Sequence, residues 1–384
     1  MRTAVATALA LLCLQAPAQG QTQEKISGCV ASATRSLYAV RVGDTPAYPC
    51  LKKDKAISWN IAGQPGPPGP PGIPSYLGVT VNCPGESINA ALAMQADRLD
   101  ITVKGACEEA VEINRDDVTL RGEVTDPTQP PTTTIKAPPG AGSAILIKGG
   151  QRLFLQDLSL QGGTFTLNSN GGASLRADHL WIKDASAIGL QTSGVTTVSN
   201  CRIENNETGV NGSMVLEDCS IINNRHIGVG AGSIQLTRTT VTGSQAGIYA
   251  ENGTVNCFHC TIRDNNGPAV VLGTSSFYSG FATIENNQSG IQAWGGSVVV
   301  LDNATVRGNV SANLGSVVSV MSASTIDGGT VPGISLGDTS AAEVAETSSV
   351  TGSTGVLCAP YPSLAHLKWP WPVSVNTNCP VPNP

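Results

Sequence analysis

A short motif of alternating apolar residues returns about every 20 residues through the middle of the chain. Successive motifs begin 18 to 22 residues apart. A glycine followed by Val, Ile or Leu marks the same period independently, for example at Gly189 and Gly209. A short period of this kind indicates a solenoid whose repeats stack on one another. The motifs begin at Leu158, Leu180, Cys201, Cys219, Thr239, Cys260, Ala282, Ala304 and Ser324.

Each repeat contains strand patterns and no helix pattern, so we expect an all-β fold, a single-stranded parallel β-helix. The handedness of crossover connections between parallel strands makes the expected coil right-handed. The span from residue 144 to residue 350 predicts about ten coils. Residues 87–96 form the best amphipathic helix pattern, with Ser87 as its N-cap, and we expect this helix to cap the N-terminal end of the solenoid.

Three residues after the inner Ile or Val of most motifs stands an asparagine, or a serine in one repeat. Stacked amides at a bend can hydrogen-bond from coil to coil and tolerate unusual backbone angles. This file resembles the asparagine ladders of the pectin-lyase-like superfamily over about residues 78–350. The resemblance implies a right-handed β-helix but not a particular activity. The file is Asn206, Asn224, Ser244, Asn265, Asn287 and Asn309.

Composition narrows the function. Charged residues make up 13% of the chain and the formal net charge is −6, which argues against a nucleic-acid binder. Residues 1–18 have the pattern of a secretory signal peptide, with Arg2 before a short apolar core and a small-x-small cleavage site. No later stretch is apolar for long enough to span a membrane. We therefore expect a secreted protein, extracellular or at the cell surface, with the periplasm as an alternative.

The sequence divides into five segments. Four glycines with a strict three-residue period follow a Cys-bounded unit that ends in Ser58-Trp59-Asn60. This arrangement resembles the N-terminal module of many exported bacterial proteins, and the collagen-like triplets imply a homotrimer, with a stiff spacer as the alternative. The expected segments are a signal peptide (1–18), a small Cys-bounded module (19–62), a collagen-like linker (63–74), the β-helix (75–350) and a C-terminal cap rich in Cys, Pro and Trp (351–384).

Cleavage after the signal leaves ten cysteines, an even number for an oxidising compartment. Nearest neighbours suggest three disulfides, Cys29–Cys50, Cys83–Cys107 and Cys358–Cys379. Of the others, Cys257 and Cys260 have the spacing of a metal or redox motif, but Cys260 is also an inward member of the repeat. We favour buried small residues, and leave open a disulfide between Cys201 and Cys219.

The column after each inner Ile or Val offers the chemical candidates. A lyase or epimerase acting on an acidic sugar needs a cation to neutralise the carboxylate, a base and an acid. The catalytic candidates Arg263, Glu285, Arg307 and Asp327 alternate in sign on adjacent coils, which also suits a purely structural ladder. The four histidines fall on different coils, and the sequence suggests no column that they share.

Enzymes that act within a cleft need walls that exclude water, and the even repeat leaves no room for long loops. We therefore expect a non-catalytic protein that presents an extended surface for adhesion or glycan binding. The alternatives are a polysaccharide lyase or epimerase acting on uronate polymers, and a purely structural, fibre-like surface component. No cofactor is predicted, and calcium is expected only for the lyase alternative. The expected partner is a polysaccharide or a cell-surface glycan.

Overall fold

A computed structural model describes residues 25–60, 74–123, 126, 129–358 and 364–367. The chain divides into two compact units, one ending at Gly72 and the other beginning at Ile73. The expected signal peptide, most of the collagen-like linker and most of the C-terminal cap lie outside the described residues. None of the helices in the described part combines the length and the apolar character needed to cross a membrane.

The first unit is a small antiparallel sheet with the strand order β2-β1-β3. The disulfide Cys29–Cys50 joins β1 to the loop that follows β2, as predicted. One face of the sheet is covered by this loop, so that Cys29 is fully buried. The strands are β1 (Lys25–Val30), β2 (Leu37–Val42) and β3 (Lys55–Asn60).

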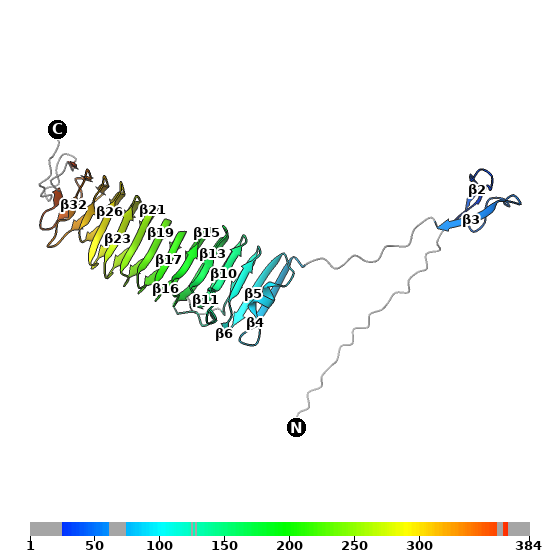
Figure 1. Ribbon diagram of the computed structural model, residues 1–384, viewed down its shortest axis with the longest axis horizontal. Helices are drawn as coiled ribbons and strands as arrows, with labels where there is room; N and C mark the ends of the chain where they lie inside the picture. Colours follow the sequence, from blue (N-terminus) through cyan, green and yellow to red (C-terminus); the bar gives the residue numbers. More distant parts are fainter. Residues whose placement is uncertain (1–24, 61–73, 124–125, 127–128, 359–363, 368–384) are drawn as a thin grey trace, which may run out of the picture. The chain divides into compact units, whose positions relative to one another are not determined.

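The second unit is an all-β parallel solenoid of about 13 turns, in which successive coils lie side by side (Figure 1). Each coil contributes strands to three parallel sheets, which we call A, B and C. Sheet A contains β7 (Val111–Asn114), β10 (Ser143–Gly149), β12 (Phe165–Ser169), β14 (Ile188–Thr192), β23 (Pro268–Gly273), β26 (Ser289–Trp294), β29 (Val310–Ala312), β32 (Ile334–Leu336) and β35 (Val356–Cys358).

Sheet B lies next along each coil and sheet C follows it. Sheet B contains β4 (Tyr76–Asn82), β5 (Arg98–Lys104), β8 (Val118–Arg121), β15 (Val195–Ser199), β24 (Ser276–Gly280), β27 (Val298–Asp302), β30 (Val317–Met321), β33 (Ala341–Val344) and β36 (Leu364–Leu367). Sheet C contains β6 (Ala106–Glu108), β9 (Thr134–Lys136), β16 (Arg202–Glu204), β18 (Ser220–Ile222), β20 (Thr240–Thr242), β22 (Thr261–Arg263), β25 (Thr283–Glu285), β28 (Thr305–Arg307), β31 (Thr325–Asp327) and β34 (Ser349–Thr351).

Some strands bend from one sheet into the next without a break. Two pass from sheet B to sheet C, namely β11 (Leu153–Gln161) and β13 (Ser174–Lys183). Three pass from sheet A to sheet B, namely β17 (Thr208–Glu217), β19 (Ile227–Thr237) and β21 (Ala246–Phe258).

The interior is a continuous apolar core made of the inward Ile, Val and Leu residues of every coil. The predicted asparagine file lines the bend between sheets C and A. The backbone N–H and the side-chain amide of Asn206 both donate to the Oδ1 of Asn224, at 3.1 and 3.0 Å. Asn265 and Asn287 repeat this pattern, so the ladder is confirmed as a hydrogen-bonded element.

A second internal ladder, which the sequence analysis missed, lies at the bend between sheets A and B. The backbone N–H of Ser275 donates to the Oγ of Ser297, and that of Ser297 donates to the Oγ of Ser316, at 3.1 and 3.2 Å. Ser340 continues the file. Each hydroxyl therefore satisfies a backbone donor on the preceding coil, so that few buried polar groups lack a partner.

The expected capping helix of residues 87–96 is not supported. The only helix in the described residues is α1 (Ile88–Leu92), a little more than one turn. Ser87 does accept from the backbone of Ala90 as an N-cap. Past the end of the helix, the guanidinium of Arg115 donates to the carbonyl oxygens of Leu92 and Met94, at 3.3 and 2.7 Å.

The predicted number of about ten coils is also wrong. Strands of the solenoid begin at Tyr76 and continue to Leu367, beyond both ends of the region where the sequence markers are regular. The predicted disulfide Cys83–Cys107 is confirmed and joins the start of the first coil to the next one. The third pair, Cys358–Cys379, includes a cysteine outside the described residues and stays a prediction.

Candidate functional site

One residue per coil makes the bend between sheets B and C, and we call this column the B/C corner. Each of these residues has a positive φ between 47° and 55°. That conformation suits Asn and Asp but costs roughly 1 kcal/mol or more for bulkier residues. Four bulky residues nevertheless occupy the corner, and each of them makes side-chain contacts. The corner residues are Asp157, His179, Asn200, Asp218, Arg238, His259, Phe281 and Asn303.

The expectation of a solenoid without walls is wrong at one place on this corner. In the coil before Asp157, residues 122–133 connect β8 to β9, whereas later coils use two to four residues here or none at all. Gln129, Pro130 and Pro131 of this connection form one side of a hollow of about 280 Å³. Corner residues and the start of sheet C form the other side: His179, Leu180, Trp181, Asn200, Cys201, Arg202, Asp218 and Ser220.

His179, a corner residue, forms a hydrogen bond with this wall. Its ring is buried, with Nε2 2.9 Å from the carbonyl oxygen of Gln129 and Nδ1 2.6 Å from the Oδ1 of Asp157. A carbonyl oxygen only accepts, so Nε2 carries a hydrogen. The sequence analysis did not find a column shared by histidines, but His179 and His259 are both corner residues, four coils apart.

Trp181 and its neighbours form a polar cluster at the hollow. The indole N–H of Trp181 donates to the Oε1 of Glu204 at 2.8 Å. The Nε of Arg202 donates to the other oxygen of the same carboxylate at 2.7 Å. Glu204 is buried, so these two donors hold its charge inside the wall of the solenoid.

Lys183 completes this cluster. Its ammonium lies 3.8 Å from the centroid of the Trp181 ring, a cation–π geometry. Among the described residues, no carboxylate lies within ion-pair distance of Lys183. Trp181 of the hollow is therefore in contact with a cation that lies just outside the lining residues and has no ion-pair partner in the described part of the chain.

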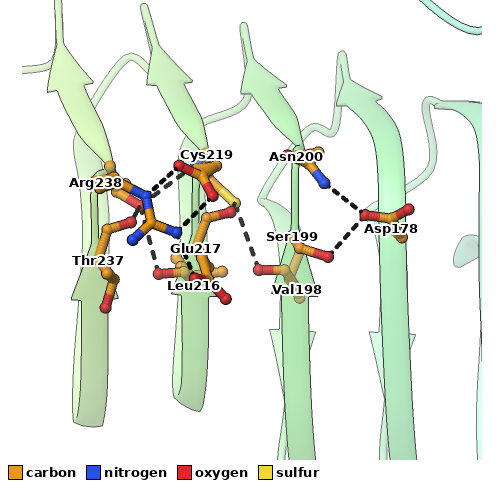
Figure 2. Close-up of polar contacts among 11 residues, drawn as sticks. Asp178, Val198, Ser199, Asn200, Leu216, Glu217, Cys219, Thr237 and Arg238 are labelled. Atoms are coloured by element: carbon orange, nitrogen blue, oxygen red, sulfur yellow. Dashed lines mark hydrogen bonds and ion pairs between the residues drawn. The ribbon is translucent and has the colours of Figure 1, made fainter. Parts of the chain in front are cut away.

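The next coils along the corner carry a network of charged side chains, drawn in Figure 2. The Nε and Nη2 of Arg238 donate to both oxygens of Asp218, at 2.7 and 2.8 Å, and Nη2 also reaches Glu217. These bonds hold the pKa of Asp218 below its usual value. Two coils before Asp218, Asp178 accepts from Ser199 and Asn200, at 2.7 and 2.8 Å.

Aromatic rings continue the corner beyond Arg238. The rings of His259 and Phe281 are stacked, with centroids 5.0 Å apart and an interplanar angle of 9°. Phe281 is 57% exposed. On the adjoining edge of sheet B, Phe258 and Tyr278 have centroids 5.4 Å apart. An exposed aromatic face on the same corner as the hollow gives the corner two features suited to a ligand.

The four sequence candidates lie in later coils, on the outer face of sheet C and in the same column as Lys183 and Glu204. Arg263 and Glu285 are neighbours in adjacent strands, and the Nη1 of Arg307 lies 2.8 Å from the Oε2 of Glu285. Asp327 accepts from the backbone of Gly329 and pairs in register with Arg307. The two arginines are more than half exposed. The structure thus places all four in one column as an exposed charge ladder, and their catalytic role stays a prediction.

Four buried cysteines are free: Cys201, Cys219, Cys257 and Cys260. The disulfide left open between Cys201 and Cys219 is not formed. Burial raises the pKa of the Cys201 and Cys257 thiols well above its usual value, which keeps them protonated and unreactive. Across the described ranges, His, Cys, Asp and Glu side chains nowhere gather in groups of three or more that could hold a metal ion.

The sequence analysis missed the hollow for two reasons. The alternation along the strands places Trp181 and Arg202 on the outer face, but it does not show that residues 129–131 lie opposite them. The wall lies before the regular repeat, and the corner residues share a backbone conformation rather than a residue type. A usable signal was available in the long gap between the strand patterns ending at Leu120 and beginning at Ala144.

Comparisons with known proteins agree with this architecture. A family model described as "Right handed beta helix region" matches residues 227–361. No curated protein matches the chain significantly in sequence. The chain therefore has the fold of right-handed parallel β-helix proteins.

Among solved structures, the chain is similar to the A-module of mannuronan C-5 epimerase AlgE4 from Azotobacter vinelandii. The identity is 15%, the TM-score 0.50, and the match covers 77% of this chain and 91% of that one. The A-module of mannuronan C-5 epimerase AlgE6 from the same organism is 14% identical, with a TM-score of 0.46, and the match covers 74% of this chain and 91% of that one. An alginate lyase from Paenibacillus sp. str. FPU-7 is 12% identical, with a TM-score of 0.31, and the match covers 76% of this chain and 99% of that one. At these identities the likeness concerns the fold.

Proposed function

We propose that this is an exported protein that binds a polysaccharide along the B/C corner of its solenoid without turning it over. The observation that carries the proposal is the hollow between the wall at Gln129–Pro131 and the side chains of Trp181 and Arg202, with the ammonium of Lys183 against the Trp181 ring. An aromatic ring provides an apolar face for a sugar ring. The free ammonium of Lys183 suits the carboxylate of a uronate unit.

Hydrogen bonding within the hollow favours binding over catalysis. Both ring nitrogens of His179 face acceptors of the protein. Both oxygens of Glu204 are occupied by donors, and Asp218 is held by Arg238. A general acid or base must reach the substrate with its proton, and these groups already use their hydrogen-bonding atoms on neighbours.

The corner also suits a polymer rather than a single sugar. Corner residues recur once per coil, about 4.8 Å apart. His179 and Phe281 are separated by five coil steps, or roughly 24 Å along the solenoid. An extended chain lying parallel to the axis can thus contact the hollow at one end and the His259–Phe281 stack at the other.

A second candidate function is a lyase or epimerase on uronate polymers, with Arg263, Glu285, Arg307 and Asp327 as its site. It is favoured by the shared fold with a module that is named as a mannuronan C-5 epimerase. On this proposal Arg263 and Arg307 neutralise the substrate carboxylate and Glu285 transfers the proton. Calcium would belong only to this alternative.

Retention on immobilised polysaccharides tests the first proposal. We expect the protein to be retained on at least one of alginate, pectate and a glycosaminoglycan. Trp181→Ala and Lys183→Ala should each weaken retention about tenfold, equivalent to about 1.4 kcal/mol. Arg307→Ala, which removes an exposed positive charge from the same column of sheet C in a distant coil, is the control and should have no effect.

Incubating the protein with the same polymers distinguishes binding from catalysis and from a purely structural role. Unsaturated uronates or an altered epimer content, lost in Glu285→Ala and kept in Trp181→Ala, would replace binding by catalysis on sheet C. If the wild-type protein neither binds nor converts any of the polymers, a purely structural role is the better account.

A further inference from the structure

We propose that the open face of the N-terminal sheet binds the same face of two other copies of this chain, so that three modules associate. We call this surface the open face, and define it as the side of β1, β2 and β3 opposite the disulfide Cys29–Cys50. The pairing register places one set of side chains on it: Ile26, Val30, Leu37, Val40, Val42, Lys55, Ile57 and Trp59.

All but one of these side chains are apolar, and they remain accessible. Leu37, Val40, Val42 and Trp59 are 46%, 48%, 57% and 39% exposed. In the middle of the sheet Gly28 has no side chain, and a Cβ there would lie 3.3 Å from Val40 and 3.4 Å from Leu37. These two residues therefore lie over the central strand and make the apolar surface continuous across the sheet.

The opposite face already has its covering. Cys29 is fully buried beneath the loop that contains Cys50. Ser27 donates to the carbonyl oxygen of Gly43 at 2.7 Å, and Tyr38 donates to Asp54 at 2.7 Å. An antiparallel sheet normally turns one face to a core and a polar face to water. Here the loop supplies the core, and the face left to the solvent is the apolar one, which marks it as an interaction surface.

The sequence that follows β3 identifies the partner. Gly63, Gly66, Gly69 and Gly72 keep a strict three-residue period, and glycine at every third position is what the crowded axis of three parallel chains requires. Four triplets are too few to hold three chains together alone. Three copies of the open face, brought together in parallel at the start of the triplets, would add the apolar burial that the triplets lack.

The mass of the full-length protein in solution tests this inference. We expect sedimentation velocity to give the mass of three chains for the wild type and of one chain for Val40→Asp or Trp59→Ser. Val195→Asp, at an exposed valine of the solenoid, is the matched control and should keep the mass of three chains. Intact Cys29–Cys50 pairing by peptide mapping shows that a variant module has folded.

Two further results would overturn the proposal. A wild-type mass of one or two chains removes the threefold association, and a mass of one chain assigns the open face to a different partner. If Gly66→Ala lowers the mass but Val40→Asp and Trp59→Ser leave it at three chains, the triplets alone hold the assembly. Polysaccharide retention by the monomeric variants separates this inference from the proposed function.

Discussion

Several residues on the B/C corner have a backbone conformation that is unfavourable for their residue type. Asp157, Asn200, Asp218 and Asn303 are residue types that tolerate a positive φ. Histidine, as at His179 and His259, is also found there, but Arg and Phe rarely are. Each of His179, Arg238, His259 and Phe281 contacts another side chain or the wall. Strained positions that persist in a fold often mark function. We attribute these four to the recognition surface.

The substitution Phe281→Asn separates the cost of the strained backbone from the contribution of the ring to polysaccharide binding. Asparagine relieves a backbone cost of about 1 kcal/mol, while the ring lost was more than half exposed and stabilised the fold only through its stack on His259. We therefore expect Tm to stay the same or rise and polysaccharide retention to fall. Calorimetry and the retention assay measure the two effects on one preparation.

Val195→Asn is the control, since it removes an exposed apolar side chain outside the corner and should not change retention. A lower Tm for Phe281→Asn would mean that the aromatic stack stabilises the fold more than the strained backbone costs. Unchanged retention would remove Phe281 from the proposed surface.

The sequence predicted the corner poorly for a reason visible in these residues. The inward columns of Ile, Val and Leu and the asparagine file repeat a residue type, so their period can be read directly. The corner repeats only a backbone angle, on side chains as different as Asp157 and Phe281. Such a column becomes visible only when strand pairing fixes which residues are stacked.

Among the structural elements, the asparagine ladder is interrupted at Ser244. Ser244 accepts no hydrogen bond, and its buried hydroxyl has no partner among the described residues, although its backbone N–H donates to Asn265 at 3.0 Å. Gly228 packs next to Ser244 in the same way that Gly209 packs next to Asn224. An asparagine at position 244 would therefore have about as much room as Asn224 has.

Ser244→Asn should therefore stabilise the solenoid. A carboxamide at this position can accept from the backbone N–H of Asn224 and join the two halves of the ladder. One added buried hydrogen bond contributes about 1 kcal/mol, which corresponds to a rise in Tm of roughly 2 °C for a domain of this size. Thermal unfolding followed by circular dichroism measures it.

The matched control is Ser297→Asn in the serine ladder. There the hydroxyl already accepts from Ser275 and donates to the carbonyl oxygen of Trp294, so the larger side chain should lower Tm. If Ser244→Asn is as destabilising as Ser297→Asn, the gap at Ser244 is a packing requirement and not an unfilled site.

At the scale of the whole molecule, the parallel β-helix was predictable because its period recurs in many coils, while its extent was not. The connection of residues 122–133 interrupts the spacing near the N-terminal end. Beyond Ile326 the strands are short and no asparagine file marks them, although β35 and β36 continue the sheets. The sequence of an exposed column is the same kind of pattern whether its side chains only stabilise the solenoid or also bind a ligand. The role of such a column therefore could not be predicted from the sequence.

Ion pairs between neighbouring coils should make the solenoid sensitive to acid. Arg238 joins its coil to Asp218 of the preceding one, and Arg152 does the same with Asp117. Both arginines hold the pKa of their aspartate below its usual value. A carboxyl whose pKa is lower in the folded than in the unfolded chain stabilises the fold above the unfolded value of about 3.9, and this stabilisation is lost as the pH falls through the folded value.

We therefore expect Tm to fall as the pH is lowered from about 5 to about 2. Asp218→Asn, which cannot ionise, should make this fall shallower, and so should Arg238→Gln. Both aspartates are partly exposed, so added salt should weaken the effect. A wild-type Tm that is constant over this range, or an equally steep fall in both variants, would show that the pairs between coils do not couple protonation to the stability of the solenoid.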